Sequence, residues 1–201
     1  MLAWSAVVLA GGASRRMGAD KLGLEVGGRP ILDRVLDAVA GAELTVAVGP
    51  ERPTARPVTW CREEPAGGGP AAAVAAGVAR CPSRTPLVAV LAGDLPFATA
   101  GALRLLAEEL EGRPDVDAAL ALDDTGRQQT LFGVWRRTAL QAACDRPDLE
   151  GLALHRLVSG IARTGVRVDA DGPPAWADCD TPEQLDAARL RAGGGGDPRV
   201  Q

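Results

Sequence analysis

The strongest constraint on the fold is an alternation of short apolar runs with helix-like segments. Residues 6–10 form an apolar, partly β-branched run that ends at two glycines, as a strand buried on both faces does. A helical spacing of apolar residues then follows Pro30 over residues 31–39. The alternation continues with strands predicted at 44–48, 58–61, 87–92 and 118–122 and helices at 71–79 and 102–110. Such a pattern predicts a mostly parallel sheet that is covered on both faces.

The last third of the chain is less regular. It has an apolar stretch at 131–135, helical patterns at 139–143 and 152–161, and short strands predicted near Val166 and Trp176. A final helix is predicted with Thr181 as N-cap, Pro182 at its first position and Gln184 at its third, ending near Arg191. We therefore expect a single α/β domain of three α/β/α layers over residues 1–191, followed by a flexible glycine-rich tail at 192–201.

The composition excludes several kinds of chemistry. The 201 residues include one histidine, His155, so a zinc centre with three histidine ligands is impossible. We assign His155 to the surface of a helix. The four cysteines are far apart and show no C-x-x-C spacing, so we expect reduced thiols rather than a zinc ribbon or a redox pair. They are Cys61, Cys81, Cys144 and Cys179.

Charge and hydropathy bear on partners and location. The 22 basic and 26 acidic side chains give a net charge of -4, which lacks the basic surplus of a nucleic-acid-binding protein. No apolar run approaches the roughly 18 residues that suggest a membrane span. The apolar run near the start of the chain lacks the basic segment of a secretory signal. We expect a soluble, cytoplasmic protein that binds neither nucleic acid nor membrane.

A glycine-rich basic loop at residues 11–21 follows the first predicted strand directly. Its sequence, GGASRRMGADK, combines backbone N–H groups that can approach phosphate with the positive charges of Arg15, Arg16 and Lys21. The spacing matches neither a Walker A loop nor the G-x-G-x-x-G fingerprint. A basic surface loop is the alternative to a phosphate site. We expect Lys21 to lie in the loop, outside the core, so that Lys21→Ala slows a reaction but leaves the fold intact.

Acidic side chains follow other predicted strands. Asp94 comes after the strand at 87–92 and fits Mg²⁺, which takes one or two carboxylates and completes its shell with phosphate and water. A turn-forming aspartate ahead of Pro96 is the alternative. Asp178 and Asp180 are predicted to end the strand near Trp176 and to share one face of it, either for a metal or to stabilise the next helix.

Two glutamates, Glu63 and Glu64, precede a glycine-rich segment at 65–70. They are either a solvated turn or acceptors for a base or sugar. Because ligands of open α/β sheets bind at the carboxyl ends of strands, the basic loop and the acidic positions should meet at one edge. The sequence thus predicts a site for a nucleotide and a metal.

Several motifs together resemble those of the nucleotidyltransferases, and most closely the molybdenum cofactor guanylyltransferases. The resemblance lies in the pattern L-A-G-G-x-S-x-R-M-G-x-D-K, followed by three shorter blocks in order. In this chain these are Leu9-Ala10-Gly11-Gly12 with Arg16-Met17-Gly18 and Asp20-Lys21, then Gly69-Pro70, Gly93-Asp94-Leu95-Pro96 and Asp180-Thr181-Pro182-Glu183. The family implies a Rossmann-like nucleotidyltransferase fold that binds GTP and Mg²⁺. The activity that the resemblance implies is attachment of GMP to the phosphate of molybdenum-molybdopterin, with release of pyrophosphate. We also expect transient contact with cofactor-delivery proteins.

The resemblance also implies residue roles. Arg16, Lys21 and Asp94 would be catalytic, and Asp94 would hold Mg²⁺ with weaker contributions from Asp178 and Asp180. The nucleotide would be bound by Leu9, Ala10, Gly11, Gly12, Lys21, Glu64 and Asp94. Positioning and charge neutralisation carry such transfers, so the lack of a histidine base is no obstacle.

Three departures from the family pattern concern four positions. Gly49 stands where some members carry an asparagine that helps to bind the nucleotide, and Glu64 stands near a position that is commonly aspartate. Asparagines replace Asp178 and Asp180 in some guanylyltransferases, whereas the Asp-x-Asp-Thr-Pro form also resembles the related cytidylyltransferases. The alternatives are therefore a cytidylyltransferase or sugar-phosphate nucleotidyltransferase on the same scaffold, or a nucleotide-binding module without turnover in cofactor delivery.

Overall fold

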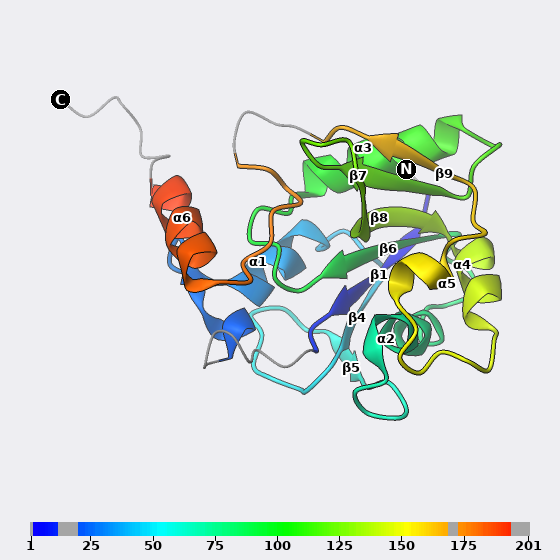
Figure 1. Cartoon of the computed structure of the whole chain (residues 1–201), viewed down its shortest axis with the longest axis horizontal. Coiled ribbons are helices and arrows are strands. Elements are labelled where there is room, and N and C mark those ends of the chain that lie inside the picture. Colours follow the sequence, from blue (N-terminus) through cyan, green and yellow to red (C-terminus); the bar gives the residue numbers. More distant parts are fainter. Residues whose placement is uncertain (1, 12–19, 169–172, 194–201) are drawn as a thin grey trace.

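The computed structural model describes residues 2–11, 20–168 and 173–193, and in these residues seven strands form one sheet (Figure 1). The strand order is β5-β4-β1-β6-β8-β7-β9. The bounds are β1 (Trp4–Leu9), β4 (Leu44–Val48), β5 (Thr59–Cys61), β6 (Leu87–Ala92), β7 (Ala118–Leu122), β8 (Gln128–Arg136) and β9 (Arg163–Val166). Of these strands β8 alone runs antiparallel to its neighbours, so the predicted mostly parallel sheet is confirmed.

Helices cover both faces of this sheet, as the buried strands predict. The bounds are α1 (Ile31–Ala38), α2 (Gly69–Val78), α3 (Ala100–Gly112), α4 (Arg137–Cys144), α5 (Leu154–Leu157) and α6 (Pro182–Gly193). Alternate side chains of β1 point to opposite faces: Ala6 and Val8 pack with α1 and α3, and Val7 packs with α2, α4 and α5. The predicted three-layer α/β/α architecture is therefore confirmed.

The close approach of α2 to the sheet depends on Gly77. A Cβ atom built at this position would lie 2.4 Å from Cγ1 of Val7 and 3.0 Å from Cγ2 of Val48. The β-branched side chains of Val7 and Val48 occupy the space between the strands and α2, so only a residue without a side chain lets the helix backbone pack this close to the sheet. The glycine-rich segment at 65–70 leads into α2, and Gly77 thus determines how close that segment lies to the edge of the sheet.

A small separate layer attaches α6 to the rest of the molecule. The single-turn helix η1 (Lys21–Gly23) leads into a short hairpin of β2 (Glu25–Val26) and β3 (Arg29–Pro30). Leu185 and Ala188 of α6 pack with Val26, Ile31 and Phe97 in their own apolar cluster. Figure 1 shows α6, in red, beside α1 at one end of the molecule. This packing brings the residues before α6 back to the edge where β6 ends.

Three expectations for the second half were wrong. The strand predicted near Trp176 is a turn, in which the Ala177 N–H donates to the Pro174 carbonyl; Pro173 and Pro174 have no N–H to give a sheet. The helix predicted over 152–161 is limited to α5, because the Ser159 hydroxyl bonds the Arg156 carbonyl and a glycine follows. Asp178 and Asp180 therefore end no strand.

The last helix, α6, extends beyond its predicted end. The helix predicted to end near Arg191 continues to Gly193, so the first two residues of the predicted tail are helical. Residues 194–201 lie outside the described part of the chain. Among the helices that are described, none is long and apolar enough to cross a bilayer.

Candidate active site

The carboxyl ends of three parallel strands meet at one edge of the sheet. Leu9 at the end of β1 is in register with Val48 of β4 on one side and with Ala92 of β6 on the other. The backbone continues this contact beyond the strands, since the Ala10 N–H donates to the Val48 carbonyl at 2.8 Å and the Gly93 N–H to the Leu9 carbonyl at 2.9 Å. The loops that carry the predicted site therefore start side by side.

A cleft of about 480 Å³ opens at this edge. Its walls are the ends of β1, β4 and β6, the start of α2 and the loop before it, and its described lining includes the carboxylates of Glu63 and Asp94. A volume of this size lies within the range of small-ligand sites. Leu9, Gly11 and Asp94, all predicted to bind the nucleotide, are among the lining residues.

Two glycines let the backbones at this edge approach closely. A Cβ atom at Gly49 would lie 2.6 Å from the Ala10 carbonyl group and from the Gly11 nitrogen, and Gly49 has a φ of 147° that other residues rarely adopt. A Cβ atom at Gly93 would lie 2.9 Å from the Leu9 carbonyl oxygen. The glycine that stands in place of asparagine at position 49 is thus required by the path of the neighbouring loop.

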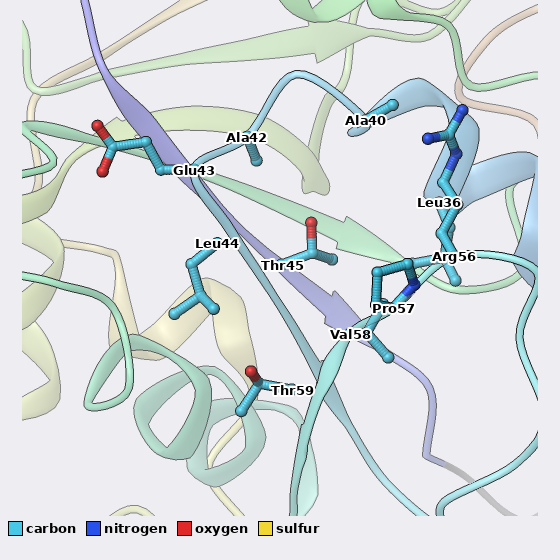
Figure 2. A pocket seen from close by; sticks show the side chains of 10 residues that line it. All are labelled: Leu36, Ala40, Ala42, Glu43, Leu44, Thr45, Arg56, Pro57, Val58 and Thr59. Atoms are coloured by element: carbon cyan, nitrogen blue, oxygen red, sulfur yellow. The ribbon is translucent and has the colours of Figure 1, made fainter.

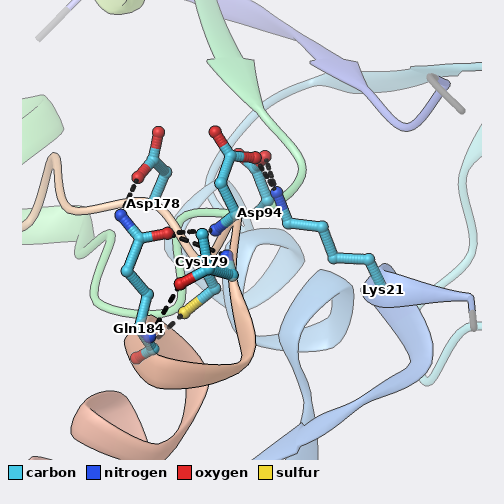
Figure 3. A network of polar contacts seen from close by, with 7 residues as sticks. Lys21, Asp94, Asp178, Cys179 and Gln184 are labelled. Carbon is cyan, nitrogen blue, oxygen red and sulfur yellow. Dashed lines mark hydrogen bonds and ion pairs between the residues drawn. The ribbon is translucent and has the colours of Figure 1, made fainter. Parts of the chain in front are cut away.

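Lys21 and Asp94 form the centre of an ionic network next to the cleft. Nζ of Lys21 donates to Oδ2 of Asp94 at 2.6 Å (Figure 3). It also donates to Oδ1 of Asp180 at 2.5 Å. The Lys21 side chain is 9% exposed, whereas that of Asp180 is half exposed. Lys21 lies in η1 and is buried, so the expectation that it lies in the loop outside the core was wrong. The structure brings together three residues that the sequence separates by up to 159 positions.

The charges of this network shift two pKa values. Burial lowers the pKa of the Lys21 ammonium, but the hydrogen bonds to Asp180 and Asp94 outweigh it and place the pKa above its ordinary value of 10.5. Burial, together with the negative charges of Asp180 and Asp94, raises the pKa of the Asp178 carboxyl. The site therefore holds more negative charge than its one ammonium neutralises, which favours the binding of a further cation.

The start of α6 organises the acidic segment before it. The predicted cap is confirmed: the Gln184 N–H donates to Oγ1 of Thr181 at 3.3 Å, and Oε1 of Gln184 accepts from the Thr181 N–H at 2.9 Å. The same Gln184 side chain also donates to Oδ1 of Asp178 at 3.3 Å. The backbone of Cys179 donates to the Asp94 carbonyl at 3.2 Å, which ties this segment to the end of β6.

Several predicted residues take positions that the sequence did not anticipate. Ala10 is buried, and its N–H and carbonyl are bonded to Val48 and Arg52, so it supports the loop from beneath. Glu64 is exposed and outside the described lining of the cleft, where Glu63 stands and accepts from the Gly67 N–H at 3.0 Å. Arg16 and Gly12 lie outside the described residues.

Arg52 is a functional candidate that sequence reasoning missed. Its guanidinium forms an ion pair with Asp20 and donates to the Ala10 carbonyl at 3.2 Å. Ala10 and Asp20 stand on either side of the segment 12–19, so Arg52 connects the two ends of the predicted phosphate loop. A single arginine after a strand carries no signal of this role, because its partners lie 32 and 42 positions away.

The donor set fits a magnesium ion. Oδ1 of Asp94 is buried and has no hydrogen-bond partner among the described residues, although the other oxygen is paired with Lys21. A buried carboxylate oxygen without a partner is a ready ligand for a hard cation. The described residues contain no group of three or more potential ligands. This small donor set is the kind that Mg²⁺ accepts when phosphate and water complete its shell.

Two other cavities in the described part of the chain are lined by no buried carboxylate oxygen that lacks a hydrogen-bond partner. One of about 400 Å³ lies between α1, β4 and β5, and Figure 2 shows Glu43 and Arg56 at its opposite ends. Arg56 is already paired with Asp37 at 2.8 Å. Another, of about 510 Å³, lies around Trp4 and the start of α3, away from the strand ends described above. The cleft beside Asp94 is therefore the candidate active site.

Comparison with known proteins identifies the family. The model of the MobA-like NTP transferase domain matches residues 6–145, a stretch that includes both Lys21 and Asp94. The chain belongs to the MobA-like NTP transferase family. It is therefore a nucleotidyltransferase, and the alternative of a binding module without turnover is set aside.

Individual relatives of this MobA-like protein extend the match. A probable molybdenum cofactor guanylyltransferase of Pelotomaculum thermopropionicum is 31% identical over 208 residues, which cover 96% of this chain and 95% of that protein. The crystal structure of molybdopterin-guanine dinucleotide biosynthesis protein A from Archaeoglobus fulgidus has the same fold, with a TM-score of 0.75, 20% identity, and coverage of 94% of this chain and 99% of that one.

A cytidylyltransferase shares this fold as well. The crystal structure of 2-C-methyl-D-erythritol 4-phosphate cytidylyltransferase from Thermus thermophilus matches with a TM-score of 0.65 and 22% identity, covering 93% of this chain and 98% of that one. The family model ends before Asp178, Asp180 and α6, whereas the alignment with the Pelotomaculum protein covers nearly the whole chain. The nucleotidyltransferase fold predicted from the motifs is thus confirmed.

Proposed function

We propose that the protein transfers GMP from GTP to molybdenum-molybdopterin and releases pyrophosphate. The observation that carries this proposal is the double position of Asp94, which lines the cleft and also pairs with Lys21. A nucleotide in the cleft would have its phosphates beside the one lysine of the chain. The curated relatives named as molybdenum cofactor guanylyltransferases support GTP and the molybdenum cofactor as substrates.

The backbone and Lys21 would bind the nucleotide. Leu9 and Gly11 lie at the end of β1, where N–H groups and small side chains let a base and sugar rest against the backbone. Glu63, which also lines the cleft, offers a carboxylate to hydroxyl or amino groups. Lys21 would exchange part of its pairing with Asp94 and Asp180 for the phosphates. Arg16, in the basic loop, would add a second positive charge.

The transfer requires a nucleophile and a leaving group in line. An oxygen of the pterin phosphate would attack the α-phosphorus of GTP, the bond from that phosphorus to the bridging oxygen would break, and pyrophosphate would leave with the bonding electrons. A phosphate monoester is largely ionised near neutral pH, so the nucleophile needs no general base. Positioning and neutralisation of charge by Lys21 and Arg16 are what this chain would supply.

Asp94 would hold the magnesium ion, with Asp180 and Asp178 as further candidates. When bound, Mg²⁺ would neutralise phosphate charge and orient the phosphates. Oδ1 of Asp94 has no partner among the described residues, so it could accept the ion without losing a hydrogen bond. Asp180 would be released for the same purpose once Lys21 turned to the phosphates.

A cytidylyltransferase is the second candidate, and a specific observation favours it. The chain keeps aspartate at both 178 and 180, the form that resembles the cytidylyltransferases, and it has no side chain at position 49 to contact a base. The acceptor phosphate and the chemistry would be the same. Because GTP and CTP differ in size and in the hydrogen-bonding edge of the base, direct competition between them separates the two candidates.

The test is turnover with defined substrates. Purified protein is mixed with Mg²⁺, molybdenum-loaded molybdopterin and either GTP or CTP, and pyrophosphate release is followed. Thermal shifts with each nucleotide give an independent measure, because a bound ligand raises the melting temperature by mass action. The proposal expects turnover and stabilisation with GTP. Turnover with CTP alone would replace it by the second candidate.

We also propose a cytoplasmic setting with transient protein partners. All four cysteines are free thiols, which suits a reducing compartment. Proteins that deliver the pterin or receive the product would contact the edge of the sheet that carries the cleft. Crosslinking at that edge, compared with crosslinking on the face covered by α3, would test this placement.

A further inference from the structure

Gln184 makes more hydrogen bonds than a helix cap requires. Oε1 of its side chain accepts from the Asp180 N–H at 2.7 Å and from the Thr181 N–H at 2.9 Å. Nε2 of the same amide donates to Oδ1 of Asp178 at 3.3 Å. Figure 3 shows this side chain between the start of α6 and Asp178. One amide group thus contacts both acidic residues that precede the helix.

The orientation of this amide follows from its partners. The backbone groups of residues 180 and 181 are donors, so the oxygen of the amide must face them. The nitrogen is then directed at the Asp178 carboxylate, which in its ionised form has no proton to donate and acts as an acceptor only. If the amide were flipped, its NH₂ group would face the two backbone N–H donors and its oxygen would face the carboxylate, so the hydrogen bonds on both sides would be lost.

The capping function by itself would need only the oxygen. A glutamate at the third position of a helix serves the capping box as well as a glutamine does. It would, however, place a second carboxylate against Asp178, in a region where Asp94 and Asp180 already share the ammonium of Lys21. The neutral NH₂ half of the glutamine is therefore the part that a cap alone does not explain.

We propose that Gln184 is a positioning residue for the acidic end of the active site: its amide fixes the Asp178 carboxylate and the Asp180 backbone in one arrangement. This rests on the proposed function, in which the aspartates serve a metal-bound nucleotide. In this role Gln184 would contact neither substrate nor metal. It acts through Asp178, as groups that hold metal ligands do, and loss of such a group costs about 10- to 100-fold in metal affinity or activity.

Two variants separate this role from capping. Gln184→Glu keeps the cap oxygen and removes the donor to Asp178, so we expect a melting temperature close to that of the wild type. The concentration of Mg²⁺ at half-maximal rate should rise about tenfold. Thr181→Ala removes the hydroxyl that accepts from Gln184 and keeps the contact with Asp178. It should lower the melting temperature and leave the Mg²⁺ dependence unchanged.

A third variant tests whether Gln184 acts through Asp178. In an Asp178→Asn background the repulsion between two carboxylates is absent, so Gln184→Glu should add little to the change in Mg²⁺ dependence. An equal, roughly tenfold loss in both backgrounds would overturn the proposal. So would a Gln184→Glu protein whose Mg²⁺ dependence matches that of the wild type.

Binding measured without turnover keeps the two proposals apart. Titration with Mn²⁺ in the presence of GTP, followed by electron paramagnetic resonance, reports metal affinity directly. A wild type that binds Mn²⁺ and GTP but releases no pyrophosphate would overturn the proposed function and leave the role of Gln184 standing. Equal Mn²⁺ affinity in the wild type and Gln184→Glu would overturn the role of Gln184. If Gln184→Glu fails to fold, Gln184→Ala in the same titration takes its place, with the same expected loss.

Discussion

Nζ of Lys21 lies 2.6 Å from Oδ2 of Asp94, although 73 positions separate the two residues along the chain. The pair joins η1 to the loop after β6, and Asp180 from the segment before α6 completes it. Lys21 is also the only lysine in the sequence; the remaining basic side chains, apart from His155, are arginines. This single ammonium therefore holds two acidic segments together, and in the proposed function it would also neutralise phosphate charge.

Lys21→Met is expected to lower the free energy of unfolding by about 1–3 kcal/mol. The change leaves Asp94 and Asp180 without their shared counter-charge, and the loss is below that of a fully buried pair because Asp180 is half exposed. Denaturant unfolding measures it. Arg84→Met is the matched control, since Arg84 pairs with Glu43 on the surface and should change stability by less than about 0.5 kcal/mol. Equal losses in both variants would contradict a special role for Lys21.

The loss of stability at high pH should depend in part on the titration of Lys21. Its pKa is raised in the folded protein above the ordinary 10.5, so its contribution is fully present below pH 10.5 and is lost as the pH rises through the folded pKa. Lys21→Met should therefore lose less stability above pH 10.5 than the wild type does. Nitrogen-15 labelling of lysine gives one side-chain resonance, whose titration reads the pKa directly. A midpoint below 10.5 would contradict the ionic network.

Thiols add to the alkaline loss of stability in both proteins, and the contributions of Cys81 and Cys144, whose pKa values do not depend on Lys21, cancel in that comparison. Burial raises the pKa of Cys81 and of Cys179 to about 11 and that of Cys144 to about 12. The chain has no tyrosine, so no phenol titrates in this range. The difference between wild type and Lys21→Met above pH 10.5 is therefore attributable to Lys21 together with Cys179, because the charge of the Lys21 ammonium lowers the pKa of the Cys179 thiol.

Gly77→Ala is expected to destabilise the protein by about 1–3 kcal/mol through overpacking. The added methyl would lie 2.4 Å from the Val7 side chain, so α2 must lift off the sheet. Gly112→Ala, at the end of α3, is the control: its Cβ atom meets nothing within 4 Å. That variant should be neutral or slightly stabilised. Thermal unfolding of the two variants decides the matter, and a stable Gly77→Ala protein would refute the close packing.

Gly49→Asn restores the residue that some relatives carry, yet we expect it to weaken nucleotide binding. The new Cβ atom would lie 2.6 Å from the Ala10 carbonyl group and the Gly11 nitrogen, so the end of β1 would have to move. Since Gly11 lines the cleft, the thermal shift with GTP should shrink. An undiminished or larger shift would show that this loop accommodates a side chain.

The parts of the fold that the sequence predicted are those with a strong local pattern. β1, β4, β6 and β7 are short apolar runs bounded by turn residues, and their predicted bounds differ from the observed ones by at most two positions. The capping box at Thr181 and Gln184 was likewise readable, because its bonds are local. The hairpin of β2 and β3 was missed, although the pair Gly27-Gly28, both with positive φ, is a typical hairpin signal.

The candidate site was predictable in its residue types and not in its contacts. The parallel-sheet rule placed Asp94 and the basic loop at one edge, which the structure confirms for Lys21 and Asp94. Asp180 reaches the same point because α6 packs on the β2–β3 hairpin through Val26 and Leu185 and because the Cys179 N–H bonds the Asp94 carbonyl, tertiary contacts with no local signature. The same holds for Arg52 between Ala10 and Asp20.

The most direct measurement is pyrophosphate release by the wild type and by Asp94→Asn, with Mg²⁺, molybdenum-loaded molybdopterin, and GTP or CTP. Asparagine keeps the shape of the side chain and removes the charge that would hold the metal. The account predicts release with GTP by the wild type and a rate lower by about a hundredfold or more in the variant, at an unchanged fold. Equal rates in the two proteins, or no release with GTP, would contradict it.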